Sequence, residues 1–261
     1  MNSKIAGVAE LTFLRVKEPA FSLLYIFGMV LGYCVSGMDV FNFQEELFMA
    51  QIPIAGTEQP LLTGFLIVTV LSVLIGIFTG ASDIPKDIDS KMIMLILGKP
   101  VSRLEYLIGK YLGIIAICAS FFLVSSLSMI ISHIVEKGNI YPLALLFRQL
   151  SLIYAIFPFV AITVMISCFT SEVTAMILSV IYIFSCFMFC AVPILMEMLP
   201  ESLAFKSPIM AIYYFFPNFY YFMIPMKLTG VVQIFMILYS ASVTVIFLTF
   251  ASIRFNSRDL I

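Results

Sequence analysis

The chain has 261 residues, of which 62% belong to the class AVILMFWYC and only 11% are charged, with a formal net charge of −1. Its mean hydropathy is +1.12, whereas ordinary soluble domains carry about 25% charged residues. These values exclude an ordinary soluble domain, and we expect the lipid bilayer to surround most of the chain and no nucleic acid to bind it.

The first stretch, residues 1–19, predicts a helix that lies in the cytoplasmic membrane interface. Its apolar residues recur at helical spacing and its charged residues occupy other positions. A secretory signal is the alternative, but no small-residue cleavage site follows a short apolar core, so we expect this segment to be retained. Pro19 then turns the chain into the membrane.

Six runs that are free of charge, apart from Lys110 at the base of the third, are long enough to cross the hydrocarbon, which takes roughly 20 helical residues. The predicted spans are 20–38, 61–81, 108–135, 149–171, 173–196 and 228–253. Ten of the 14 Lys and Arg residues then lie on one side. The positive-inside rule makes this side cytoplasmic, so both termini are expected there.

The segment 200–226, before the last span, is uncharged over most of its length but contains Pro208, Pro217 and Pro225 among many aromatic residues. Proline disfavours a straight helix, and aromatic residues are enriched at membrane interfaces. We expect a re-entrant or interfacial segment on the outer side, with a seventh span as the alternative.

One cytoplasmic loop, between the second and third spans, carries an amphipathic pattern over residues 83–97. The pattern predicts a short helix with Pro85 in its first turn. Gly98 suits the left-handed position after the last turn, and Pro100 prevents the helix from continuing.

A second helix should begin directly after this joint. Ser102 and Glu105 match the S-x-x-E capping box, in which each residue binds the other's backbone amide. Lys110 follows at the base of the third span, where its side chain can extend toward headgroups. Gly109 and Gly113 are four residues apart, as small residues are where two helices approach closely.

Catalytic and nucleotide-binding patterns fail in this sequence. The pair Gly109-Lys110 does not fit the phosphate loop G-x-x-x-x-G-K-[ST], because Leu104 and Tyr111 stand at two required positions. The one histidine, His133, has no hydrolase motif around it, which leaves an intramembrane enzyme as a disfavoured alternative.

Ion-coupled transport is also not indicated. Glu172, in the sequence "TSEVT", is expected in the first turn of a helix that begins after a tight turn, and a place in an ion path is the alternative. All five cysteines fall within predicted spans, where we expect them to pack as small apolar residues and not to bind metal. Energy for transport should come from another chain.

The stretch "DIPKDIDSKMIMLILGKPVSRLEYLIGKYLG", residues 83–113, resembles the corresponding region of ABC-2 type permeases, the membrane subunits of ATP-driven exporters. Weaker similarities are "FFPNF" at 215–219 and "RFNSRDL" at 254–260. Within the family, the chain looks most like the compact group that includes the permease of the nitrous oxide reductase maturation exporter. It departs from the family's pattern at Asp87, where Glu is more frequent, and at Ser90-Lys91, where Gly-Thr is.

The resemblance implies an all-α integral membrane protein with six transmembrane helices, an N-terminal interfacial helix, a cytoplasmic coupling helix at 83–97 and a re-entrant outer segment. It implies a dimer with itself or a related permease in a bacterial or archaeal cytoplasmic membrane. A separate ATP-binding subunit would bind ATP and Mg, and this chain would hold no cofactor.

The residues expected to couple this chain to the ATP-binding subunit lie in and after the predicted coupling helix. Their alternative role is a solvated helix face, and the alternative function is a membrane scaffold or assembly factor without a transported substrate. The nine candidates are Asp83, Asp87, Lys91, Gly98, Pro100, Ser102, Arg103, Glu105 and Lys110.

Overall fold

The computed structural model describes residues 3–14, 19–37, 59–97, 101–137, 143–189, 192, 213 and 230–257. Within these ranges the fold is entirely helical, as the composition predicted, and contains no strand. The helices are α1 (Ser3–Leu14), α2 (Pro19–Gly37), α4 (Gln59–Asp89), α5 (Met92–Leu97), α6 (Arg103–Lys137), α7 (Leu143–Phe169), α8 (Glu172–Phe189) and α12 (Gly230–Ser257).

Each predicted span coincides over most of its length with one of the helices α2, α4, α6, α7, α8 and α12. Four helical segments are long and apolar enough to cross a membrane within the described ranges: Ile67–Asp89, Arg103–Val135, Ser151–Phe169 and Gln233–Ser257. The predicted re-entrant segment 200–226 lies outside the described residues, apart from Tyr213.

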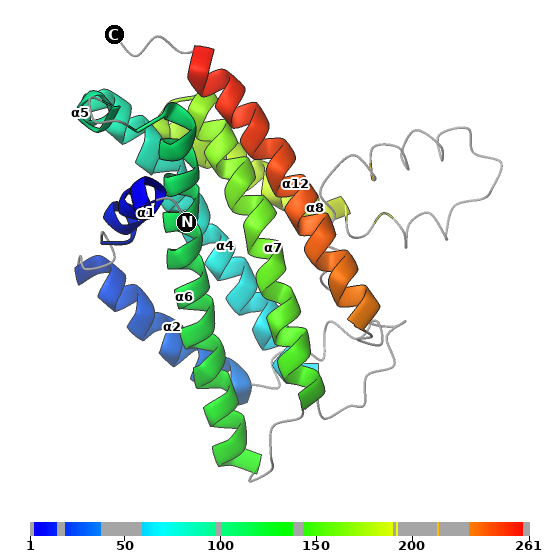
Figure 1. The fold of residues 1–261 in the computed structure, drawn as a ribbon. Coiled ribbons are helices and arrows are strands. Elements are labelled where there is room, and N and C mark those ends of the chain that lie inside the picture. Colours follow the sequence, from blue (N-terminus) through cyan, green and yellow to red (C-terminus); the bar gives the residue numbers. More distant parts are fainter. Residues whose placement is uncertain are drawn as a thin grey trace, which may run out of the picture.

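The long helices lie side by side and run in alternating directions (Figure 1). One end of the bundle therefore gathers the end of α4, the start of α6, the end of α7, the start of α8 and the end of α12. Helix α1 lies beside the start of α6, and α5 lies at the outer edge of the same end. We call residues 83–97 and 101–110 the elbow, because the chain turns back here from α4 into α6.

Three pairs of glycines, each four residues apart, bring helices into close approach. A Cβ atom at Gly28 of α2 would lie 2.6 Å from the ring of Phe121 on α6, and one at Gly113 of α6 would lie 2.6 Å from the Cβ atom of Thr12 on α1. The pairs are Gly28 and Gly32, Gly76 and Gly80, and Gly109 and Gly113. The close approach predicted at Gly109 and Gly113 is confirmed, and its partner is α1.

Helix α7 contains Pro158, which has no N–H to donate to the carbonyl of Tyr154 one turn earlier. Ser240 of α12 donates to that carbonyl instead, at 2.7 Å. The hydroxyl of Tyr111 on α6 donates to the neighbouring carbonyl of Phe157 at 3.2 Å. Hydroxyls from two adjacent helices thus bind the α7 backbone at the proline, which is how membrane helices tolerate this residue.

Several other buried hydroxyls in the described bundle bind the backbone of their own helix. Thr69 donates to the carbonyl of Phe65, and Ser72 donates to the carbonyl of Val68, both at 2.7 Å. Such bonds satisfy a hydroxyl in an apolar setting without a partner on another helix. The middle of the bundle therefore holds its helices mainly through the fit of apolar and small side chains.

Candidate functional site

The single helix predicted over 83–97 is wrong. Helix α4 continues from the membrane segment to Asp89 with Pro85 inside it, and a turn at Ser90 and Lys91 separates it from the six-residue helix α5. The turn is closed by Ser90, whose backbone N–H and hydroxyl both donate to the carbonyl of Lys86. Lys91 takes the left-handed conformation, with φ of 55°, which ends α4 seven residues before Gly98 was expected to end a helix.

Pro85 misled the prediction because proline favours the first turn of a helix. It removes only one hydrogen bond inside α4, and its ring is buried. The consequence concerns Asp83 and Asp87. They belong to the buried end of a long membrane helix and not to a separate helix on the surface.

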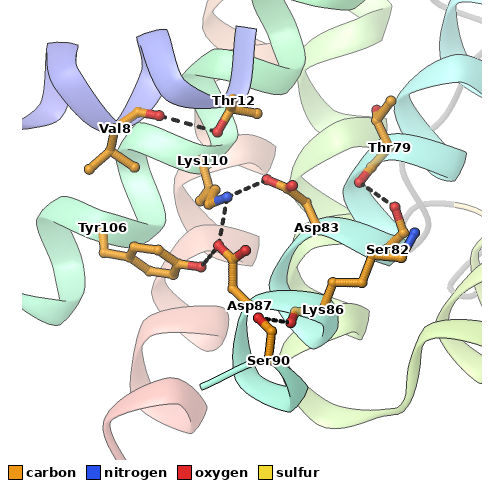
Figure 2. Close-up of polar contacts among 10 residues, drawn as sticks. All are labelled: Val8, Thr12, Thr79, Ser82, Asp83, Lys86, Asp87, Ser90, Tyr106 and Lys110. Atoms are coloured by element: carbon orange, nitrogen blue, oxygen red, sulfur yellow. Dashed lines mark hydrogen bonds and ion pairs between the residues drawn. The ribbon is translucent and has the colours of Figure 1, made fainter. Parts of the chain in front are cut away.

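Asp83 and Asp87 lie one turn apart on α4 and face Lys110 of α6 (Figure 2). The Lys110 Nζ atom is 2.7 Å from the Oδ2 atom of each carboxylate, and the three side chains are only 3%, 2% and 5% exposed, in the order of the sequence. The hydroxyl of Tyr106 donates to the same Oδ2 atom of Asp87 at 2.7 Å. We call these four residues the charge cluster.

The charge cluster holds two carboxylates and one ammonium group, so its formal charge is −1 in a site closed to water. Burying charges costs free energy that only good geometry and additional hydrogen bonds can offset. The Tyr106 hydroxyl supplies one such bond, and the Lys110 Nζ atom also lies 5.7 Å from the centre of the Tyr106 ring. The cluster therefore fixes the end of α4 against the start of α6.

The burial of Asp83, Asp87 and Lys110 differs from the exposed positions that the sequence suggested. The carboxylates of Asp83 and Asp87 point into the protein and away from the exposed surface of the elbow. Lys110 does not extend toward headgroups, because its ammonium group binds both carboxylates. The sequence does contain two acidic residues four positions apart and a lysine at the base of the next span. Their pairing across the elbow could be recognised only from the three-dimensional structure.

The predicted capping box at the start of α6 is confirmed. The backbone N–H of Ser102 donates to the Glu105 Oε2 atom at 2.8 Å, and the N–H of Glu105 donates to the Ser102 hydroxyl at 3.2 Å. Both side chains thus serve the helix start. This reciprocal pair gives α6 a defined first residue at the elbow.

Arg103 binds the end of α12. Its Nη1 atom donates to the carbonyls of Phe255 at 3.1 Å and Asn256 at 2.9 Å. The rings of Tyr106 and Phe255 are stacked beside this contact, with centroids 5.7 Å apart and planes at 13°. A cation at the carbonyl end of a helix is favourable, because the last carbonyls have no donors of their own.

On the opposite side of α6, helix α1 covers the charge cluster. Val8 and Thr12 lie against Gly109 and Gly113, which flank Lys110 in the sequence. The Thr12 hydroxyl donates to the carbonyl of Val8 at 3.2 Å, so it adds no unpaired group beside Lys110. Figure 2 shows Lys110 between α1 and α4.

The outermost part of the elbow is the turn after α4. Asp89, Ser90, Lys91 and Met92 are exposed, and Met92 keeps 49% of its surface although it is apolar. We call these four residues the elbow tip. Of the sequence candidates, Lys91 alone lies in it. Gly98 and Pro100 lie outside the described residues.

Glu172 is part of a turn, as its surroundings predicted. It stands in the first turn of α8 directly after Ser171, and its carboxylate lies 2.9 Å from the Lys86 Nζ atom. Both side chains are partly exposed, at 32% and 56%. This surface pair explains Glu172 without an ion path.

Two comparisons with known proteins bear on this architecture. The model of a family described as ABC-2 family transporter protein matches residues 19–260, which include every described helix from α2 to α12. No curated protein matches the sequence. Since the match runs through the elbow and through all the membrane helices, the chain belongs to the ABC-2 family of transporter proteins and is a multi-pass membrane permease.

Proposed function

We propose that this chain is the permease subunit of an ATP-driven ABC exporter, in which a separate subunit hydrolyses ATP and this chain moves the substrate across the membrane. The observation that carries the proposal is the charge cluster behind the elbow tip. A force applied at an exposed turn reaches the membrane helices only if the turn is held firmly. Asp83, Asp87 and Lys110 provide that hold.

The elbow tip is the contact we propose for the ATP-binding subunit. Its exposed residues combine opposite charges at Asp89 and Lys91 with the apolar Met92, which suits a mixed polar and apolar groove. Ile93, the next residue, is 1% exposed and anchors the start of α5. In this arrangement Asp83 and Asp87 act by holding the elbow and not by touching the partner.

The remaining expectations belong to the same proposal. The chain would pair with a second copy or a related permease and carry two ATP-binding subunits, which bind ATP and Mg. We place it in a bacterial or archaeal cytoplasmic membrane, in the compact group that includes the nitrous oxide reductase maturation exporter permease. The position of α1 and the end of α12 at the elbow end supports the proposal that both termini are cytoplasmic.

Affinity purification of the tagged chain from its native host tests the proposal. We expect an ATP-binding subunit, identified by mass spectrometry, to remain with the chain and to hydrolyse ATP in liposomes. Exchanging the charges of the elbow tip, by Asp89→Lys with Lys91→Glu, should remove most of that subunit. Lys4→Glu, on the exposed surface of α1, is the control and should leave the complex intact.

One result would contradict the proposed function, and another would contradict only the proposed contact. Purification of the chain without any ATP-binding subunit would favour a membrane scaffold or assembly factor. A complex that survives the charge exchange would place the contact away from the elbow tip, although an ATP-driven permease would still stand.

A further inference from the structure

The elbow also contacts α12, the last of the described helices. Arg103 stands at the first position of α6, and its guanidinium donates to two carbonyls at the end of α12. Both carbonyls lie in the last turn of α12, where no N–H group of the helix itself can donate to them. The guanidinium of Arg103 therefore satisfies acceptors that the helix leaves unpaired. The start of α6, the third predicted span, is thus hydrogen-bonded to the end of α12, the sixth.

Tyr106 joins three helices with one side chain. Its hydroxyl binds Asp87 of α4, its ring stacks on Phe255 of α12, and its backbone belongs to α6. Both Tyr106 and Phe255 have no measurable exposure. A displacement of α4 or α6 at this level must carry the Phe255 ring with it or break the stack.

Two further contacts at this end of the bundle involve exposed or partly exposed side chains. Lys86 and Glu172 join α4 to α8 through partly exposed side chains, and exposed ion pairs contribute about 0.2–1 kcal/mol. Arg254 of α12 lies 5.7 Å from the centre of the Phe169 ring at the end of α7. The elbow therefore contacts α12 through the buried stack of Tyr106 on Phe255 and through the partly exposed hydrogen bonds of Arg103, whereas its ion pair with α8 is partly exposed.

Helix α12 also packs along α7, and a hydrogen bond joins the two helices further into the membrane. Ser240 binds the Tyr154 carbonyl that Pro158 leaves open in α7. Helix α12 therefore has a fixed point at its middle on α7 and a second one at its end on the elbow. Movement of the elbow relative to α7 would tilt the half of α12 that lies between these two points.

We propose that Arg103 and Tyr106 are positioning residues that transmit movement of the elbow to α12, so that the ATP-driven step tilts the last membrane helix together with the start of α6. This inference rests on the proposed function, because it takes an ATP-binding subunit as the source of the movement. In this inference, movement of the elbow displaces two membrane helices, α6 and α12. The alternative is that Arg103 only caps α12 and stabilises the fold.

Distances between spin labels in the complex with the ATP-binding subunit separate these roles. One label pair joins α6 to α8, at Leu104→Cys and Val173→Cys, and the other joins α12 to α8, at Ile253→Cys and Val173→Cys. All three positions are exposed. The five native cysteines are replaced by alanine, and labelled chains are diluted with unlabelled ones so that each complex carries one labelled copy.

With a non-hydrolysable ATP analogue and Mg, we expect both distances to change. Arg103→Met removes the guanidinium at similar length, so the α12 distance should lose most of its nucleotide-dependent change while the α6 distance keeps its own. Arg103→Lys retains a donor and should restore part of the loss. Arg254→Met removes a cation from the same end of α12 without touching the elbow, and it should behave as the parent does.

A second variant keeps the test informative if Arg103→Met does not assemble. Phe255→Leu removes the stack with Tyr106 and leaves both carbonyl acceptors of Arg103 in place, so a partial loss at α12 is expected. The inference is overturned if the α6 distance changes in the parent while the α12 distance does not. It is equally overturned if Arg103→Met and Phe255→Leu lower stability but leave the α12 change intact.

The same measurements keep the two proposals apart. If neither distance responds to nucleotide and no ATP-binding subunit remains with the chain, the proposed function fails and this inference fails with it. If the subunit remains and the α6 distance responds while α12 stays still, only the inference fails.

Discussion

The middle of the bundle and its elbow end hold helices together by different physical means. In the middle, glycine pairs such as Gly76 and Gly80 let backbones approach, and buried hydroxyls bind their own helices. At the elbow end, two carboxylates, an ammonium group and a guanidinium bind across helices at distances of 2.7–3.1 Å. Shape complementarity therefore determines the contacts in the middle of the bundle, and charge determines those at the elbow end.

The difference bears on how each region responds to change. A contact made by shape loses free energy in proportion to the misfit, and the neighbouring side chains can relax in part. A buried charge that loses its partner keeps its whole desolvation cost. The elbow end should therefore be the less tolerant region, and its contacts should be made or broken as a unit.

The largest effect is expected at Lys110. Lys110→Met leaves two buried carboxylates without a cation, which should lower the free energy of unfolding by about 3–5 kcal/mol. Unfolding in mixed micelles with increasing dodecyl sulfate measures the loss. Lys86→Met removes a lysine whose partner Glu172 is partly exposed, and this control should cost about 1 kcal/mol or less.

A further variant tests whether charge is the cause. Asp83→Asn and Asp87→Asn, combined with Lys110→Met, remove every charge of the cluster and should recover most of the stability. Equal losses for Lys110→Met and Lys86→Met would show that the cluster is not buried as described, and the contrast between the two regions would fail.

A smaller effect is expected where shape decides. A Cβ atom at Gly113 would lie 2.6 Å from the Thr12 Cβ atom and 2.9 Å from the Ala9 carbonyl oxygen, and neither atom can move without shifting α1. Gly113→Ala should therefore cost about 1–3 kcal/mol, as overpacking does. The same micelle titration measures it.

Gly7→Ala is the matched control, because it makes the same substitution on α1 where no atom lies within 4 Å of the new Cβ. Alanine is the better helix former, so this variant should gain about 0.5–1 kcal/mol. If both variants gain stability, α1 does not pack against α6 at Gly109 and Gly113. The claim that α1 covers Lys110 would then also be wrong.

The sequence was sufficient to predict the features that depend on local patterns. Hydrophobic runs predicted where long helices lie, and Ser102 with Glu105 predicted the start of α6, because a capping box needs only four neighbouring residues. The spacing of Gly109 and Gly113 predicted a close approach but could not identify α1 as the partner. Local signals thus predicted the long helices and the start of α6, but not the turn at Ser90 and Lys91 that separates α4 from α5.

The charge cluster could not be predicted in the same way. Asp87 and Lys110 are far apart in the sequence, and an amphipathic pattern does not distinguish a face that contacts water from one that contacts another charge. The carbonyls that Arg103 binds belong to Phe255 and Asn256, and a backbone acceptor has no sequence signature at all. The charge cluster could therefore be identified only from the three-dimensional structure, although its charged residues are conspicuous in so apolar a sequence.

The smallest expected effect tests the hydrogen bond from Ser240 of α12 to the Tyr154 carbonyl of α7 in the apolar middle. Ser240→Ala leaves the Tyr154 carbonyl without a donor, because Pro158 has no N–H. Interhelical hydrogen bonds in membranes contribute about 0.6 kcal/mol on average and about 1.7 kcal/mol at most. Ser242→Ala, which removes an exposed hydroxyl bound to its own helix, is the control and should have no effect.

Pro158→Ala decides what the Ser240 bond does. Alanine restores an N–H that can donate to the Tyr154 carbonyl within α7, so Ser240→Ala should cost nothing in that background, and a double-mutant cycle should show the difference as coupling between the two positions. An equal cost in both backgrounds would mean that Ser240 does not replace the missing donor. In that case α12 would have no fixed point at its middle, and its tilt would be set at the elbow alone.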